Sequence, residues 1–247
     1  MKKTILSGLT ALAAGALLAA DATPKEEITQ AAKKLGDKPN YSWRTTITVP
    51  EEAQFKPGPS DGKTEKDGFT WVGMSFFDNQ MQAVMKGSKG ALTDQDGAWR
   101  SLEELEKEEG PGRFGAMIVR NIKTPAKEAA QLAAAVKALK KEEIKKEENL
   151  YSGDLTEEGA AAMQRFGPPG SPGPTVSDAK GSVKFWLKDG LLTKYEFKLK
   201  GTIKFNENEF PNDRTTTVEI KDVGKTKLEV PDEAKKKLEA KSDSATK

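Results

Sequence analysis

Cysteine and histidine are both absent from this 247-residue chain. Their absence excludes cysteine nucleophiles, Ser-His-Asp and Cys-His arrangements, thiolate zinc sites, disulfides and histidine-ligated haem or iron. Any catalysis would have to use carboxylates, lysine, tyrosine or an oxygen-ligated metal. The composition therefore argues against an enzyme, and we expect no catalytic residues, no metal site and no cofactor.

An excess of charge of either sign is also absent, since 40 Lys and Arg residues face 38 Asp and Glu residues. The formal net charge of +2 gives no electrostatic reason to expect nucleic acid or an anionic membrane as the main partner. Charged residues make up 32% of the chain and hydrophobic residues 36%. A sheet with one apolar face and one solvent-facing face would give that balance.

The one long apolar run lies at the N-terminus. Met1-Lys2-Lys3 is a short basic segment, Ile5 to Ala20 is apolar or small apart from hydroxyl residues, and Ala20-Asp21-Ala22 matches an A-x-A cleavage pattern. These parts predict a signal peptide over residues 1–22, cleaved after Ala22 or, as second choice, after Ala20. A membrane anchor is the alternative, but the run of 16 residues is short against the roughly 20 usual for a bilayer. We expect a bacterial periplasmic or secreted protein with no stable membrane span after cleavage.

Alternation of apolar and polar residues predicts antiparallel strands in both halves of the chain. The clearest is 195–205, apolar on one face and charged on the other, which follows a type I′ turn signal at Asp189-Gly190. Other strands are expected at 41–49, 69–77, 80–85, 183–188 and 214–223, with a hairpin at 87–99 and a short edge segment at 225–230.

Apolar stripes and capping residues predict short helices at 23–35, after Ser101, after Thr124-Pro125, at 156–166 and from Pro231. The polar segment 56–68 and the Gly/Pro-rich segment 167–174 are expected to be loops, and 240–247 a disordered tail. The run 140–148, in which Lys and Glu alternate, is interpreted as a charged helix end or linker. Together these elements predict one α+β domain over residues 23–239.

Three short motifs suggest chemistry but fail on spacing or context. Gly62-Lys63-Thr64 resembles the end of a phosphate-binding loop, yet Pro57 stands where its first glycine is needed. Ser60 and Ser177 each precede a lysine by three residues, but the partner motifs of S-x-x-K enzymes are missing. Asp94-x-Asp96-Gly97 begins like a calcium loop and lacks the later ligands, so a hairpin turn explains it better.

A set of aromatic and methionine residues on the predicted strands is the one constellation with functional potential. Residues that fill a core and residues that line a cavity for a lipid or acyl chain have the same sequence pattern, so the pattern alone does not separate the two. The candidate cavity-lining residues are Tyr41, Trp43, Trp71, Met74, Phe76, Met81, Phe185, Tyr195 and Phe197.

The order of these segments resembles a known family. An amphipathic helix runs into an aromatic strand (ITQAAKKLGDKPNYSW, from Ile28), and the chain closes with a long hairpin (GSVKFWLKDGLLTKYEFKLKG) and the segment TTTVEIKDVGKTKLEVP. This pattern, over about Thr23 to Pro231, resembles the outer-membrane lipoprotein carrier superfamily (LolA-like), particularly its LppX-type branch. The closing strand 215–220, the turn at 222–224 and an edge segment ending at Pro231 carry most of the resemblance.

The resemblance implies a strongly curved antiparallel sheet, a half-barrel, covered on its concave side by short helices around an apolar cavity. It also implies lipid or lipoprotein acyl chains as cargo, with an envelope lipoprotein or a transporter as a further partner. The chain departs from LppX-type lipoproteins because it has no cysteine to acylate. Arg44 is the positional candidate for the basic side chain that lipoprotein carriers use.

These observations favour a non-enzymatic exported carrier that shelters an apolar ligand between sheet and helices. Segments 167–174 and 56–68 are the candidates for a loop that moves to admit it. Two alternatives stay open: an interaction or sensor module of the same fold with a filled core, and a hydrolase that uses carboxylates.

Overall fold

The computed structural model describes residues 22–53, 56–76, 79–145, 147–165, 174–205 and 207–239. The expected signal peptide therefore lies outside the described residues except for Ala22, and the expected tail 240–247 lies wholly outside them. The expected loop 167–174 lies outside them except for Pro174.

One antiparallel sheet of eleven strands, in the order β6-β5-β4-β3-β2-β1-β11-β10-β9-β8-β7, forms the body of the protein. It consists of two meanders joined where the first and last strands pair, with Trp43 opposite Ile220 and Thr45 opposite Val218. The strands are β1 (Asn40–Thr48), β2 (Ser60–Glu65), β3 (Thr70–Phe76), β4 (Asn79–Lys86), β5 (Lys89–Thr93), β6 (Trp99–Ser101), β7 (Lys140–Lys145), β8 (Glu148–Asp154), β9 (Thr175–Lys188), β10 (Leu191–Phe205) and β11 (Asn208–Lys221).

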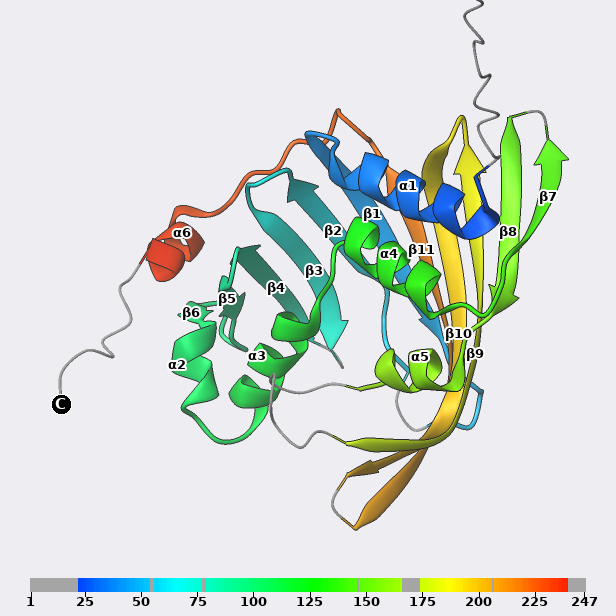
Figure 1. The fold of residues 1–247 in the computed structure, drawn as a ribbon. Helices are drawn as coiled ribbons and strands as arrows, with labels where there is room; N and C mark the ends of the chain where they lie inside the picture. The colour runs from blue at the N-terminus through cyan, green and yellow to red at the C-terminus, as the bar shows by residue number, and fades with distance from the viewer. Residues whose placement is uncertain are drawn as a thin grey trace, which may run out of the picture.

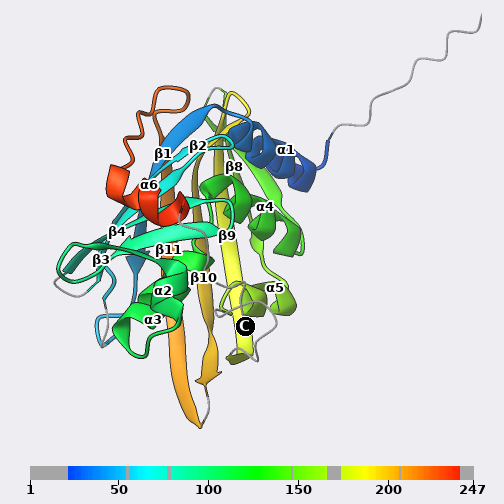
Figure 2. The ribbon, with the colours of Figure 1, turned by 90° about the vertical axis from the view of Figure 1, so that its left-hand side faces the viewer.

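The sheet curves around its helices, as Figures 1 and 2 show from two directions, and this confirms the predicted fold class. The helices of the described residues are α1 (Pro24–Gly36), α2 (Leu102–Glu106), α3 (Pro111–Asn121), α4 (Pro125–Ala135), α5 (Glu157–Ala162) and α6 (Asp232–Glu239). Capping boxes start two of them, Ser101 with Glu104 at α2, as the sequence predicted, and Thr23 with Glu26 at α1.

Two apolar clusters lie on the concave face. In the larger, buried residues of α1, α4 and α5 pack on β1 and β8–β11; Leu132 of α4 and Leu199 of β10 are both fully buried. In the smaller, α2 and α3 cover β4 and β5 through Leu102, Leu105 and Val119. Each helix cluster thus covers a different half of the curved sheet, which leaves a boundary between them over the middle strands.

The last helix packs on the opposite face. Ala234 and Leu238 of α6 pack with Val84, Ala91 and Trp99. Val84 and Ala91 point away from the concave side because their chain neighbours Ala83 and Leu92 point into it, and Trp99 lies opposite Thr93, which shares the face of Ala91. The expectation that the helices cover the concave side therefore holds for five of them, and α6 is the exception.

Four segments differ from their sequence expectation. The charged run 140–148 is not a helix end, because α4 ends at Ala135 and the run forms β7, a turn and the start of β8. The expected loop 56–68 contains β2, which is hydrogen-bonded between β1 and β3. Helix α3 was not predicted, and the expected edge segment 225–230 forms no strand.

Candidate functional site

The deep concave core is filled by aromatic side chains rather than left open. Tyr41, Trp43, Phe185, Tyr195 and Phe197 are at most 5% exposed and belong to the larger cluster. The ring centroids of Phe185 and Tyr195 lie 6.3 Å apart, those of Tyr195 and Phe197 lie 6.3 Å apart, and those of Tyr41 and Trp43 lie 5.9 Å apart. Five of the nine predicted residues are therefore brought together as the floor of the concave face.

Two predicted methionines lie at the boundary between the clusters. Met74 of β3 is half-buried and packs against both apolar clusters, as do Met85 and Ile122. Met81 of β4 is half-buried and packs against the smaller cluster. Methionine adapts its shape to irregular surroundings, so a boundary lined this way can repack around a guest.

Trp71 lies on the opposite face of the sheet from the other predicted residues. Its indole Nε1 donates to Gln82 Oε1 at 3.1 Å, and it packs against the cluster that α6 covers. Trp71 therefore does not face the concave interior. Phe76 belongs to β3, but its side chain is not among the described ones.

The exposure of the concave face changes from one cross-strand row to the next. In one row, Trp43, Gly62, Val72 and Ala83 lie opposite one another on β1 to β4, and all are buried. The adjacent row has four members on the same strands, all of them half-buried, and we call it the Thr45–Met81 row; its members are Thr45, Ser60, Met74 and Met81. Directly opposed residues share a face, so this row is concave-face surface that the helices leave partly uncovered.

A polar cluster that the sequence analysis missed lies beside this row. The hydroxyl of Tyr195 donates to Glu128 Oε2 on α4 at 2.6 Å. Arg214 lies opposite the buried Leu199 and therefore also faces the concave side. Its Nε is buried and has no hydrogen-bond partner. Arg214 could have been found from the sequence, since it shares the inward register of Val218 and Ile220.

Burial governs the ionisation of this cluster. Loss of solvation raises the pKa of Glu128, against the hydrogen bond from Tyr195 and the charges of Lys123 and Arg214. Loss of solvation also raises the pKa of Tyr195 well above its ordinary value and lowers that of Arg214. Glu128 and Arg214 nevertheless keep part of their surface accessible. These groups are thus surrounded by protein on most sides, while part of each residue's surface stays accessible.

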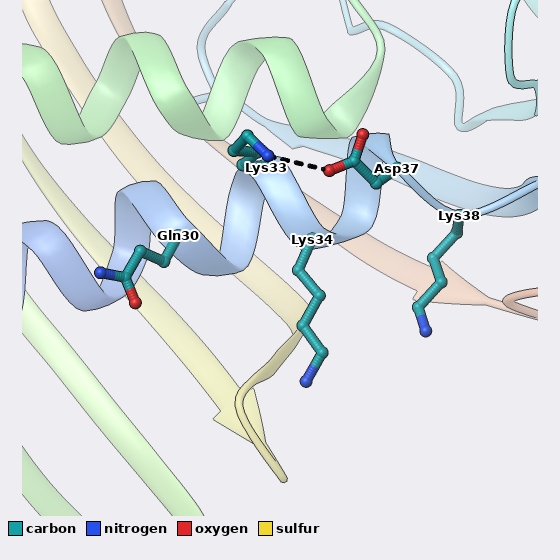
Figure 3. Close-up of a pocket in the computed structure, with 5 residues that line it drawn as sticks. All are labelled: Gln30, Lys33, Lys34, Asp37 and Lys38. Carbon is teal, nitrogen blue, oxygen red and sulfur yellow. Dashed lines mark hydrogen bonds and ion pairs between the residues drawn. The ribbon is translucent and has the colours of Figure 1, made fainter.

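Two surface pockets are lined mainly by residues with charged or polar ends. One lies on α1 and is lined by Gln30, Lys33, Lys34, Asp37 and Lys38, with an ion pair of 3.2 Å between Lys33 and Asp37 (Figure 3).

A second pocket lies beside Trp71, with Lys63, Gln82 and Pro231 among its walls, on the face that α6 covers. Neither pocket opens at the Thr45–Met81 row.

Arg44, the candidate for the basic side chain of lipoprotein carriers, does not face the concave interior. It lies exposed on β1 and pairs with Asp61 at 3.4 Å, on the face opposite Trp43. Because β2 is a central strand, the segment 56–68 cannot open as a free loop.

In the described ranges no three acidic side chains gather as a metal ion would require. None of the described helices combines the length and apolarity needed to cross a bilayer.

Comparison with known proteins finds likeness at the level of structure. No protein family and no curated protein matches the sequence. The structure of the lipoprotein LppX from Mycobacterium tuberculosis is similar with a TM-score of 0.47 and 11% identity, over 83% of this chain and 96% of LppX. LprF from Mycobacterium bovis gives a TM-score of 0.44 and 11% identity, over 86% of this chain and 100% of LprF. Each likeness is one of fold alone. It agrees with the LppX-type resemblance of the sequence.

Proposed function

We propose that the protein is an exported, non-enzymatic carrier that binds the apolar part of a lipid or acyl chain on the concave face of its sheet. The observation that carries the proposal is the partial exposure of the Thr45–Met81 row between two separately packed helix clusters. The ligand lies over this row and not among the aromatic residues beneath, which already fill their space.

The energetics of such a site need no catalytic or polar group. Each methylene that leaves water contributes about 0.8 kcal/mol, so an acyl chain laid over the methionines is stabilised by burial alone. Met74, Met85 and Ile122 contact both clusters, and a small separation of α3 from α4 would admit the chain between them. Because these residues are only half-buried, separating α3 from α4 exposes less new apolar surface than opening either cluster would, and so costs less free energy.

Native mass spectrometry with lipid extraction, on protein purified from its own host, tests the proposal. We expect a co-purifying lipid in stoichiometric amount, and uptake of a fluorescent fatty acid by the delipidated protein. Met74→Glu places a charge on the concave face and should weaken uptake at least about tenfold, because burying an unpaired carboxylate opposes binding.

Ser75→Glu is the matched control, since Ser75 follows Met74 on β3 and points to the other face. Its uptake should equal that of the unmodified protein. An apo mass together with no uptake of fatty acid or phospholipid would overturn the carrier. That outcome would favour the interaction or sensor module with a filled core, for which the packed aromatic rings are the supporting observation.

A further inference from the structure

Arg214 lies on the concave face and has no ion-pair partner among the described residues. Along β11 the side chains alternate, so Asp213 faces outward and pairs with Lys200 at 2.7 Å, whereas Arg214 faces inward beside Leu199. The Nε of Arg214 is buried and unbonded. Within the described residues Arg214 makes no ion pair shorter than 4.0 Å, and the acidic residue that acts on it electrostatically is Glu128.

Glu128 is engaged elsewhere. One of its carboxylate oxygens accepts the hydroxyl of Tyr195 at 2.6 Å, and burial favours its protonated form. Tyr195 lies directly opposite Val218 on β11, and Val218 and Arg214 point to the same, inward side of that strand. With Glu128 bonded to Tyr195, no carboxylate of the described residues pairs with the guanidinium of Arg214.

A partly buried guanidinium without an ion-pair partner is unfavourable, because its charge loses solvation and gains no compensating interaction. A guanidinium also presents its donors as a planar fork that matches two oxygens of a carboxylate or phosphate. A side chain of this kind is suited to an anion that arrives from outside.

The registers place this cation in line with the proposed lipid site. Val218 of β11 lies opposite Thr45, the first member of the Thr45–Met81 row, and Arg214 lies four residues along the same strand. The distance from Val218 to Arg214 along the strand is about 13 Å, and the row from Thr45 to Met81 spans three strand spacings, about 14 Å. Arg214 and the Thr45–Met81 row thus lie on the same face of neighbouring strands, at a separation that an extended acyl chain can span.

We propose that the ligand is an amphiphile with an anionic head, a carboxylate or a phosphate, that Arg214 holds by paired hydrogen bonds while the apolar chain lies over the Thr45–Met81 row. This inference rests on the proposed carrier function and names its class of cargo. Asn212, which precedes Arg214 on the inward register, is already bonded to Gln164 at 2.6 Å, so Arg214 is the group that selects the head.

Matched amphiphiles test the inference on the full chain. Hexadecanoate, hexadecyl phosphate and hexadecanol share one apolar chain and differ in the head, and their affinities are measured by displacement of a fluorescent fatty acid. We expect one or both anionic heads to bind about tenfold or more tightly than the alcohol, as hydrogen bonds to charged groups allow. Arg214→Gln should remove this preference and leave the alcohol affinity unchanged.

Two variants make the result specific. Arg44→Gln removes an exposed arginine of the other face and should keep the preference. Arg214→Lys keeps the charge and loses the planar pair of donors, so it should keep only part of the preference for an anionic head. This variant also tests the role of Arg214 if Arg214→Gln does not fold. Inorganic phosphate should not compete at concentrations where hexadecyl phosphate does.

The outcomes separate the two proposals. Equal binding of all three heads, or a preference that survives in Arg214→Gln, would overturn the role of Arg214 while the carrier function stands. Equal competition by inorganic phosphate would point to a free anion and overturn the amphiphile. Failure of every amphiphile to bind would overturn the carrier function itself.

Discussion

Trp43 occupies the space in which Gly62 would carry a side chain. The two residues lie opposite each other on β1 and β2, and a Cβ atom placed on Gly62 would lie 2.1 Å from two ring carbons of Trp43. Trp43 is only 5% exposed, so the glycine is what allows the indole to pack against the sheet. The glycine of Gly62-Lys63-Thr64 is thus explained by this contact, and the three residues belong to strand β2 and not to a phosphate-binding loop.

Gly62→Ala should therefore destabilise the protein. The added methyl group forces Trp43 from its position, and overpacking of this kind costs about 1–3 kcal/mol. The free energy of unfolding measured in urea checks the expectation. Lys63→Ala, next on the same strand but on the other face, is the control and should change it by less than about 1 kcal/mol. Equal stability of the two variants would show that the indole can rotate away at little cost.

The polar strand β2 shows why part of the sheet could not be predicted. Its sequence, SDGKTE, has no apolar alternation. The inward positions need no apolar side chain of their own, because Trp43 covers the position of Gly62 and the hydroxyls of Thr64 and Thr70 bond to each other at 2.7 Å. The neighbouring strands make it a strand, and strand propensity depends strongly on such context. By contrast the long hairpin of β9 and β10 carries its own pattern and its turn residues, Asp189 and Gly190, both at positive φ.

The charged strand β7 was mistaken for a helix end for a related reason. Lys and Glu are good helix formers, but the chain leaves α4 after Ala135 and passes over Gly153 of β8, where an added Cβ would lie 2.1 Å from the carbonyl oxygen of Ala138. β7 then pairs with β8 alone. Charges along an edge strand oppose pairing with other chains, so its composition suits an edge rather than a helix.

The candidate site was predictable only where it consists of strand patterns. The candidates Met74 and Met81 lie on the concave face, whereas Trp71, named together with them, lies on the opposite face. The polar cluster was beyond reach because it joins α4 to β10 and β11, which are far apart in the sequence. Only the inward register of Arg214 within a strand left a trace in the sequence.

Glu128→Gln should change how stability depends on pH. Burial raises the pKa of Glu128 in the folded protein, so its contribution to stability is complete below about pH 4.3, the pKa of an unfolded glutamate. That contribution is lost as the pH rises through the folded pKa, because the unfolded chain then releases the proton more readily. Lys123, Tyr195 and Arg214 are the ionisable groups that act on it.

Urea unfolding over a series of pH values measures this effect. The stability of Glu128→Gln relative to the unmodified protein should rise with pH above about 4.3. Glu103→Gln, on the exposed surface of α2, controls for the loss of a carboxylate. A difference between Glu128→Gln and the unmodified protein that stays constant with pH would contradict the burial of an ionisable carboxyl.

Glu27 should behave in the opposite sense. Partial burial raises the pKa of Glu27, but hydrogen bonds from Lys141 and Tyr151, at 2.7 Å and 2.6 Å, outweigh it and lower the pKa overall. Its contribution to stability is therefore present above about pH 4.3 and is lost as the pH falls through the lower, folded pKa. Glu27→Gln should thus be destabilising at neutral pH by about 1–2 kcal/mol and nearly neutral in acid.

The partner of Glu27 provides the control. Tyr151→Phe removes only the hydroxyl, and a double-mutant cycle with Glu27→Gln should give a coupling free energy of about 1 kcal/mol at pH 7. Additive effects would mean that the hydrogen bond between α1 and β8 contributes nothing measurable.

Gln164 should determine how firmly α5 is held on the sheet. Its Nε2 donates to the carbonyl oxygens of Ala160 and Lys200, both at 3.1 Å, and its Oε1 accepts from Asn212 at 2.6 Å. The residue is 2% exposed, so Gln164→Ala would leave buried polar groups without partners, at a cost of about 1–3 kcal/mol. Hydrogen exchange is the measurement: the amides of Ala160 and Met163, bonded within α5, should exchange faster.

Gln131→Ala, exposed on α4, is the matched control and should leave exchange in α5 unchanged. The comparison separates two ways of holding α5. If its amides exchange at the original rate in Gln164→Ala, the apolar contacts of Ala160 and Ala161 are sufficient and the network is dispensable. If they exchange faster while the amides of β10 do not, the bonds of Gln164 hold α5 locally, next to the strand position that carries Arg214.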